Sequence, residues 1–325
     1  MNEKMERKLL RRRFSAQGWT LLVYYLIMNV CVVGVVMAQT MVKMFRLLAE
    51  NGLNAFDRYL EELASGVMGN AWGYFLAAGI GFVILLFWKG KRFLFSELWT
   101  PGRPMGVRDF LSLSCVLVCG QLLFNTVAVI LEFIMNLFGL SVLGAVESAT
   151  LAGTDTLSMF LYAGILAPIA EEILFRGLIQ RSLMPYGKKF AILTSAILFG
   201  VFHGNLVQSP FAFAVGLVLG YAAAEHSILW AMAMHMFNNM VISDMLGRLT
   251  SLLPGQWGDA ASWAVIIIMS IVGIIVLLVR RREVAAYLRC DRISGKCMGA
   301  FFTAPGIIVL LIIMLANALM SITVL

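Results

Sequence analysis

The stretch APIAEEILFRGLIQ, residues 167–180, places two glutamates and an arginine inside an otherwise apolar run. Ionisable side chains at membrane depth are costly, so they indicate function by default. Glu172 and Arg176 are four residues apart and share one face of a helix, where they can form an ion pair. Glu171 lies about 100° around the helix axis, which leaves it free for chemistry. Pro168 is expected to kink the helix and open space beside this carboxylate.

The whole chain has the composition of an integral membrane protein. Of its 325 residues, 61% are hydrophobic and 13% are charged, against about 45–50% and about 25% in soluble domains. Apolar runs long enough for the ~30 Å hydrocarbon core recur throughout, and we expect an all-α, polytopic transmembrane helix bundle. The nine expected spans are 19–41, 71–88, 110–140, 159–180, 190–206, 210–224, 228–246, 263–279 and 304–323.

The basic residues indicate how the chain crosses the membrane. Nine spans put the termini on opposite sides, and 20 of the 25 Lys and Arg residues then fall on the side of the N-terminus. Because short basic loops stay in the cytoplasm, we expect a cytoplasmic N-terminus and an external C-terminus. After the first span, apolar residues recur at helical spacing within residues 54–64, which predicts an interfacial helix.

The charge and the cysteines exclude other classes of protein. The formal charge of +7 would suit nucleic acid, but the basic residues stand in short clusters between apolar runs, so no nucleic-acid partner is expected. Membrane lipid is the expected surrounding instead. The five cysteines show no Cys-x-x-Cys metal or redox spacing.

Two of the three histidines also fall inside apolar runs. His203 follows Phe199 by four residues and Asn239 follows His235 by four, so each pair shares a helix face. At a rise of ~1.5 Å per residue, Glu171 and these three polar side chains lie within about 10 Å of one depth. A single cytoplasm-facing cavity is therefore expected to hold all four. Taken alone, the glutamates and the arginine also fit a buried salt bridge that only joins helices.

Such a set of side chains supports hydrolysis of a peptide bond. A carboxylate beside an imidazole can take a proton from water, and a second imidazole with a carboxamide can donate to the oxyanion that forms. Glu171, His203 and His235 could instead hold a zinc ion as a facial triad that activates the water. The residues leave both mechanisms open. The alternatives from other classes are an ion-coupled transporter and a non-catalytic immunity protein that binds a peptide.

Three motifs, in order, carry a resemblance to a known family. They are Glu171-Glu172-x-x-x-Arg176, then Phe199-x-x-x-His203, then His235-x-x-x-Asn239. They resemble the motifs of the CPBP intramembrane proteases, also called the CAAX protease and bacteriocin-processing, or Abi, family. The resemblance covers about residues 159–246. It divides the chain into an N-terminal transmembrane region (1–158), a catalytic core (159–246) and a C-terminal transmembrane region (247–325).

The resemblance implies an all-helical membrane endopeptidase in which Glu171 and His203 activate water, while His235 and Asn239 form the oxyanion hole. The implied supporting residues are Glu172, Arg176 and Phe199. Members were first described as metalloproteases, but the structurally described branch resembles a glutamate protease without a catalytic metal, so we favour the metal-free mechanism.

Relatives of this kind trim prenylated C-terminal tripeptides or act in bacterial peptide maturation, signalling and bacteriocin self-immunity. A membrane-associated peptide or protein is thus the expected substrate, and a bacterial cell membrane the expected location. Glu132 and Asp244 lie in apolar runs but match no motif. A hydrogen bond between packed helices is the role expected for them.

Overall fold

The computed structural model describes residues 3–51, 70–150, 156–290 and 292–325. Regular structure in these residues is helical, apart from one antiparallel pair of two-residue strands. The all-α class is therefore confirmed. The interfacial helix expected at residues 54–64 lies outside the described residues.

The elements follow the three expected regions of the chain. The first region contains α1 (Glu3–Asn51), α3 (Trp72–Phe95), η2 (Glu97–Trp99), α4 (Val107–Asn136), β1 (Leu140–Ser141) and α5 (Leu143–Thr150). The second contains α6 (Leu157–Leu161), η3 (Tyr162–Leu166), α7 (Ala167–Glu172), η4 (Ile173–Gln180), α8 (Arg181–Leu183), η5 (Met184–Tyr186), α9 (Lys188–Phe202), α10 (Gln208–Glu225), α11 (Ile228–Met236) and η6 (Phe237–Met245). The third contains α12 (Leu246–Thr250), α13 (Trp257–Val279), α14 (Arg281–Cys290), α15 (Gly295–Phe302), α16 (Pro305–Met320) and β2 (Thr323–Val324).

Several helices are long and apolar enough to cross a membrane, so this is an integral membrane protein. Among the described residues, five helices qualify by length and composition, or six if α15 and α16, bent by 60°, count as one broken span. The nine expected spans include three more, at 190–206, 210–224 and 228–246, which fold as α9, α10 and α11 with η6. Helix α9 has only 15 residues. The count of nine stays a prediction.

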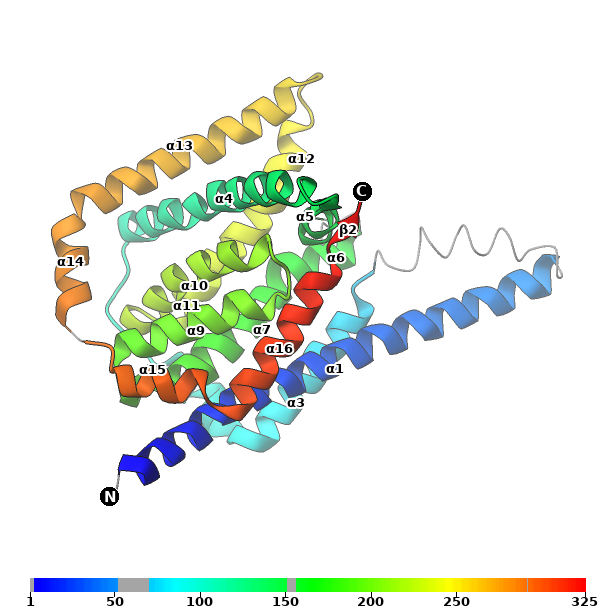
Figure 1. Cartoon of the computed structure of the whole chain (residues 1–325). Helices are drawn as coiled ribbons and strands as arrows, with labels where there is room; N and C mark the ends of the chain where they lie inside the picture. Colours follow the sequence, from blue (N-terminus) through cyan, green and yellow to red (C-terminus); the bar gives the residue numbers. More distant parts are fainter. Residues whose placement is uncertain (1–2, 52–69, 151–155, 291) are drawn as a thin grey trace.

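The two ends of the helix bundle are well separated. The N-terminus lies at one end and the C-terminus at the other (Figure 1). At the N-terminal end, Glu225 binds the side chains of Arg103, Lys188 and Tyr287, which come from three of the basic loops. At the C-terminal end, β1 pairs with β2. The loops expected on one side of the membrane therefore do lie together.

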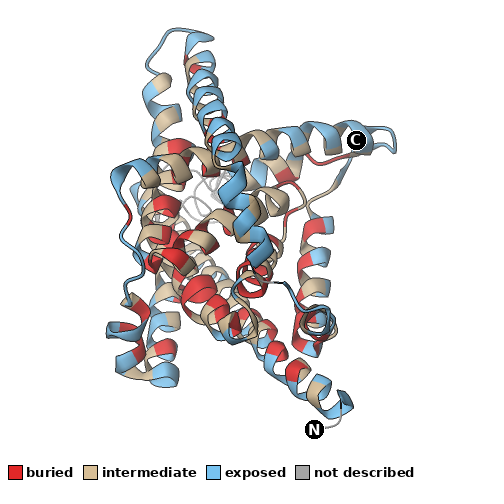
Figure 2. Ribbon diagram, turned by 90° about the vertical axis from the view of Figure 1, so that its left-hand side faces the viewer, coloured by how far each residue is buried: buried red, intermediate tan, exposed pale blue. Residues whose placement is uncertain are grey.

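The core lies between the inner helices. Buried residues gather there, whereas the outer helices are largely exposed (Figure 2). Helix α10 packs against α9 and α4. The largest fully buried side chains of the core are aromatic, namely Phe14, Phe175, Phe190, Phe199 and Phe301. Helix α1 thus contributes to the same core as the helices that carry the motifs.

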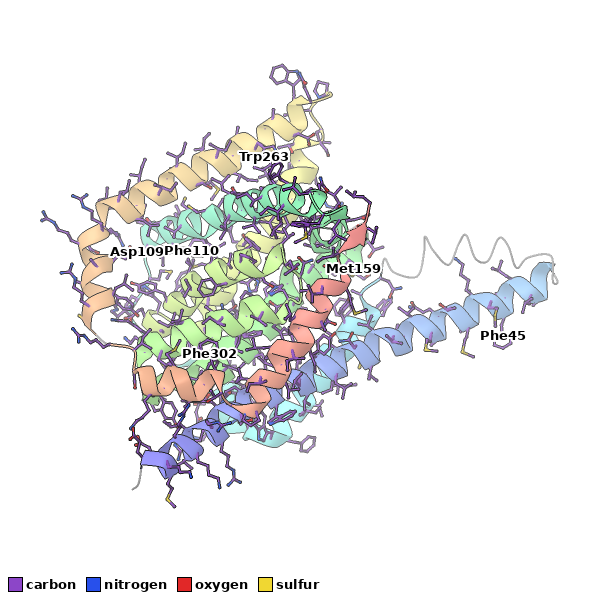
Figure 3. All side chains as sticks on the ribbon, in the orientation of Figure 1. Phe45, Asp109, Phe110, Met159, Trp263 and Phe302 are labelled. Atoms are coloured by element: carbon purple, nitrogen blue, oxygen red, sulfur yellow. The ribbon has the colours of Figure 1, made fainter. Side chains whose placement is uncertain are left out.

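Helices α1 and α16 cross at two glycines. A Cβ on Gly18 would overlap the backbone of Gly306, and the Ser15 hydroxyl accepts a hydrogen bond from the Gly306 N–H at 2.7 Å. Small residues let membrane helices approach this closely. Further along, α1 extends away from the other helices (Figure 1), where Phe45 is 61% exposed (Figure 3).

Glu132 and Asp244 make local bonds rather than the bonds between packed helices that were expected. Glu132 accepts hydrogen bonds from the Ser141 hydroxyl at 2.9 Å and from the Val142 N–H at 2.8 Å, so it holds the turn after α4. Asp244 pairs with Arg248 one helical turn later, at 2.9 Å. Both carboxylates therefore have structural partners outside the motif residues.

Candidate active site

Three π-helical turns, η3, η4 and η6, interrupt the helices that carry the first and third motifs. Such turns are rare and occur frequently at functional sites. Pro168 follows η3 and has no N–H, so the carbonyl of Ala163, five residues earlier, lacks a π-helical partner. The Asn239 carboxamide donates to that carbonyl at 3.2 Å. The third motif is thereby joined to the helix of the first.

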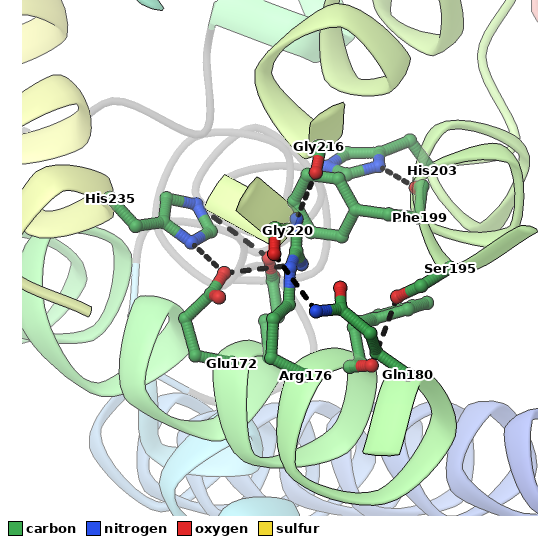
Figure 4. Close-up of polar contacts among 11 residues, drawn as sticks. Glu172, Arg176, Gln180, Ser195, Phe199, His203, Gly216, Gly220 and His235 are labelled. Atoms are coloured by element: carbon green, nitrogen blue, oxygen red, sulfur yellow. Dashed lines mark hydrogen bonds and ion pairs between the residues drawn. The ribbon is translucent and has the colours of Figure 1, made fainter. Parts of the chain in front are cut away.

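Glu172 and Arg176 form the expected ion pair. The Glu172 Oε1 and Arg176 Nη1 atoms are 3.2 Å apart, and both side chains are fully buried. Glu172 has a second partner that the spacing did not predict, because the same Oε1 lies 3.0 Å from Nδ1 of His235. Arg176 donates in addition to the carbonyl of Gly216 on α10 at 3.1 Å (Figure 4).

Two further buried side chains were not singled out from the sequence. Gln180 donates to the carbonyl of Gly220 at 2.9 Å, and Ser195 donates to the carbonyl of Phe175 at 2.9 Å (Figure 4). They tie η4 to α10 and to α9. Gln180 continues the four-residue spacing of Glu172 and Arg176, which is the signal that could have found it.

Part of this buried cluster has no partner among the described residues. The Oε1 atom of Gln180 and the Nε atom of Arg176 make no hydrogen bond there. Both side chains line a cavity of about 220 Å³ between η4 and the turn from α10 to α11. A volume of this size has room for several water molecules, each taking about 30 Å³. Water can therefore satisfy both atoms.

Glu171 differs from Glu172 in its surroundings. Its side chain is 25% exposed, while that of Glu172 is 0% exposed. The Glu171 Oε2 atom lies 3.8 Å from Nε2 of His235, which is too long for a hydrogen bond. As expected, Glu171 stays outside the pair with Arg176. The two glutamates instead face opposite nitrogens of the His235 ring.

His203 caps the end of α9. Its Nδ1 atom lies 2.7 Å from the carbonyl of Phe199, one of the last carbonyls of the helix. A carbonyl can only accept, so Nδ1 carries the hydrogen and Nε2 of the neutral ring is left as an acceptor. Gly204 follows with a φ of 56°, a left-handed conformation that glycine adopts at no steric cost. The helix ends there, and the ring is held in one orientation.

Phe199 brings the histidines of the second and third motifs together. Its ring contacts His203 at a centroid distance of 5.0 Å and His235 at 5.7 Å, both edge to face. The Arg176 guanidinium lies over the same ring, 4.5 Å from its centroid. Glu171 also interacts electrostatically with His203. The three motifs therefore meet at one depth, as the helix rise predicts.

Asn239 lies against η3 rather than against Phe199. One N–H of its carboxamide is taken up by Ala163, and its oxygen accepts a hydrogen bond from Asn238 at 3.0 Å. The second N–H is left for another acceptor. The single cavity expected to hold all four motif side chains is not found in that form, because the cavities between α1, α3 and α7 and beside Gln180 include none of them.

The side chains do not fit the zinc site that the residue types left open. In the described part of the chain, no three His, Cys, Asp or Glu side chains are arranged to hold a metal ion. Nδ1 of His235 is bound to Glu172, and Nδ1 of His203 is bound to a carbonyl. We therefore derive no step through a metal.

The fold and the site define a class of protein: a helical membrane protein with a carboxylate and two imidazoles gathered at one buried point, as hydrolases require. Residues 153–241 match the family described as type II CAAX prenyl endopeptidase Rce1-like. The chain thus carries an Rce1-like domain, and this family consists of peptide hydrolases. No curated protein and no solved structure matches the chain.

Proposed function

We propose that the protein is an intramembrane endopeptidase that hydrolyses a peptide bond of a membrane-associated peptide or protein. The observation that carries the proposal is the meeting of Glu171, His203 and His235 around Phe199. Of the buried carboxylates, Glu172 is already occupied by Arg176 and His235. Glu171 has no hydrogen-bonded partner among the described residues, which leaves it able to act as a base.

In the proposed reaction, Glu171 takes a proton from a water molecule while the water oxygen attacks the carbonyl carbon of the substrate. His203 orients that water by accepting a hydrogen bond at Nε2. The tetrahedral intermediate then collapses, the C–N bond breaks, and Glu171 passes its proton to the leaving amine. The products are a carboxylate and an amine, and the base returns to its starting state.

His235 and Asn239 are the proposed oxyanion donors. Because Nδ1 of His235 already donates to Glu172, its Nε2 can donate only when the ring carries both protons. A carboxylate at Nδ1 stabilises this charged form, which gives Glu172 a role beyond the pair with Arg176. Asn239 would supply the second donor through its remaining N–H.

The proposed orientation places the N-terminus in the cytoplasm of a bacterial cell, with α9, α10 and α11 crossing as the fifth, sixth and seventh of nine spans. The clustering of the basic loops at one end supports it. In a cysteine-free background, single cysteines within 247–262 are expected to react with an impermeant maleimide added to intact cells. Cysteines within 281–300 are expected to react only after lysis, and the reverse pattern would overturn the orientation.

The catalytic proposal is tested by purifying the protein into liposomes with peptide probes. The family description suggests a farnesylated peptide that ends in Cys-aliphatic-aliphatic-Met, and unlipidated hydrophobic peptides serve as a second set. Glu171→Gln and His203→Ala are expected to abolish cleavage while membrane levels stay normal. Asn239→Ala is expected to lower turnover about 100- to 1000-fold, as removal of an oxyanion donor does.

The third histidine offers a matched control. His226 lies in the turn after α10 and bonds to the carbonyl of Arg103, so His226→Ala is expected to leave turnover unchanged. Cleavage that survives Glu171→Gln would contradict the mechanism. Activity that chelator removes and zinc restores would instead favour the metal-dependent alternative. A peptide bound but never cut would point to a non-catalytic immunity protein.

A further inference from the structure

An apolar cavity of about 660 Å³ lies between α1, α3 and the helix that carries Glu171. Most of its walls are apolar side chains such as Val23, Phe82 and Ile173. Tyr24 brings a hydroxyl group to this lining from α1. The cavity reaches Ala170, the residue before Glu171, so its inner end lies beside the candidate base.

The Tyr24 ring is held in place from two sides. It lies 6.0 Å, centroid to centroid, from Phe202 on α9, the residue before His203. On the other side it faces Gly81 of α3, where even an added Cβ would lie 3.7 Å from the ring. Tyr24 also interacts electrostatically with Glu171. A residue of α1 is thus directed toward the candidate site.

A second tyrosine reaches the same point from η3. Tyr162 interacts electrostatically with both Tyr24 and Glu171. Its ring is stacked on Tyr74 of α3 at a centroid distance of 4.5 Å and an interplanar angle of 22°. The hydroxyl groups of Tyr24 and Tyr162 have no hydrogen-bond partner within the described residues. Each is therefore available to a small polar molecule in front of the carboxylate.

We propose that Tyr24 is a positioning residue of the peptidase, and that its hydroxyl and that of Tyr162 hold the water molecule that Glu171 activates. The assignment rests on the proposed function. Polar groups that approach one another without direct contact in a buried site are commonly bridged by water. Two hydroxyl groups, each able to donate and accept, can fix the water while a carboxylate accepts its proton.

The neighbouring residue provides a matched control. Tyr25 is turned toward α16, where its hydroxyl accepts a hydrogen bond from Asn317 at 2.6 Å. Tyr24→Phe and Tyr25→Phe each remove one hydroxyl from the same turn of the same helix. Only the first removes a group that faces Glu171, so a general effect on the packing of α1 would appear in both variants.

The experiment measures kcat and KM in liposomes with the probe peptide that wild-type protein cleaves best. Tyr24→Phe is expected to lower kcat about tenfold, the size expected for one hydrogen bond of ordinary strength. KM and thermal stability should stay unchanged. Tyr25→Phe is expected to keep kcat. Since both tyrosines hold one water, Tyr24→Phe with Tyr162→Phe should lose less than the product of the single effects.

A kcat for Tyr24→Phe within twofold of wild type would overturn the assignment, and so would a rise in KM alone, which would mark Tyr24 as part of the substrate path. Equal losses in Tyr24→Phe and Tyr25→Phe would also overturn it. If Tyr24→Phe fails to fold, Tyr162→Phe carries the same expectation. Absence of cleavage by wild-type protein would instead reject the proposed function, so the two failures are distinguishable.

Discussion

Helices α9 and α13 show two different ways in which a helix belongs to a membrane protein. Helix α13 has a mean hydropathy of 2.9 over its best window, of which only 11% is buried. Helix α9 has 15 residues and is too short to qualify as a span, yet nine of them are buried, including Thr194 and Ser195. The outer helix is apolar because lipid surrounds it. The inner helix carries polar side chains because neighbouring helices satisfy them.

The difference explains why hydropathy recognises the flanks of this protein more readily than its centre. The residues matched to the peptidase family, 153–241, include α9, α10 and α11. None of these three qualifies as a span by length and composition. The stability of the centre should therefore depend on particular bonds and contacts, and that of the flanks on general apolar character.

The largest effect is expected from breaking the buried ion pair. Arg176→Met leaves the Glu172 carboxylate buried without its cation, which should cost about 3–5 kcal/mol. Glu172→Gln should cost as much, because a fully buried guanidinium then loses its carboxylate, and both proteins should be scarce in membranes. The double variant should be more stable than either single one. Unfolding measured by steric trapping in bicelles would test this, and equal costs for all three variants would contradict it.

The crossing of α1 and α16 should be nearly as sensitive. Gly18→Leu would force a side chain into the backbone of Gly306, at a cost of about 3 kcal/mol. Gly34, on the same helix, has open space where a Cβ would stand. Gly34→Leu is thus the matched control and should be close to neutral. If both leucines cost the same, helix propensity rather than close packing determines the effect.

Two isoleucines compare the inner and outer helices directly. Ile192 on α9 is 7% exposed, and Ile268 on α13 is 60% exposed. Ile192→Ala should cost about 2 kcal/mol through lost packing. Ile268→Ala should stay within about 0.5 kcal/mol, as surface substitutions do. Thermal unfolding in one detergent measures both, and a larger loss at Ile268 would reverse the comparison.

The smallest effect concerns the polar end of the bundle and depends on pH. Burial raises the pKa of Glu225, but hydrogen bonds from Lys188, Tyr287 and Arg103 outweigh it and hold the pKa below its ordinary value of 4.5. A lowered pKa means that Glu225 stabilises the fold above pH 4.5 and loses this contribution as the pH falls through the folded value.

Glu225→Gln should therefore lower stability by about 1 kcal/mol at pH 7, where hydrogen bonds to a charged group are fully formed. The difference from wild type should shrink below pH 4.5, because the wild-type carboxyl is then protonated as well. Melting temperatures of both proteins between pH 3 and pH 7 give the comparison. A constant difference would assign the effect to packing instead of charge.

Much of the site could be read from residue spacing. A four-residue interval places two side chains on one helix face, and this determined the pair of Glu172 and Arg176, the freedom of Glu171 and the common depth of the two histidines. Composition determined the membrane and the helical class, since only closed hydrogen bonding within each segment is tolerated in lipid. These properties are local, so the linear order of residues contains them.

Other features depend on contacts between segments far apart in the chain. The bond from His235 to Glu172 joins residues 63 positions apart, and that from Asn239 to Ala163 joins residues 76 positions apart. Tyr24 reaches the site from outside the matched region, and no motif marks it. Which carboxylate an imidazole faces, and which tyrosine of α1 turns inward, follow from how the helices pack. Periodicity gives the face of a helix, but only the tertiary structure decides what that face meets.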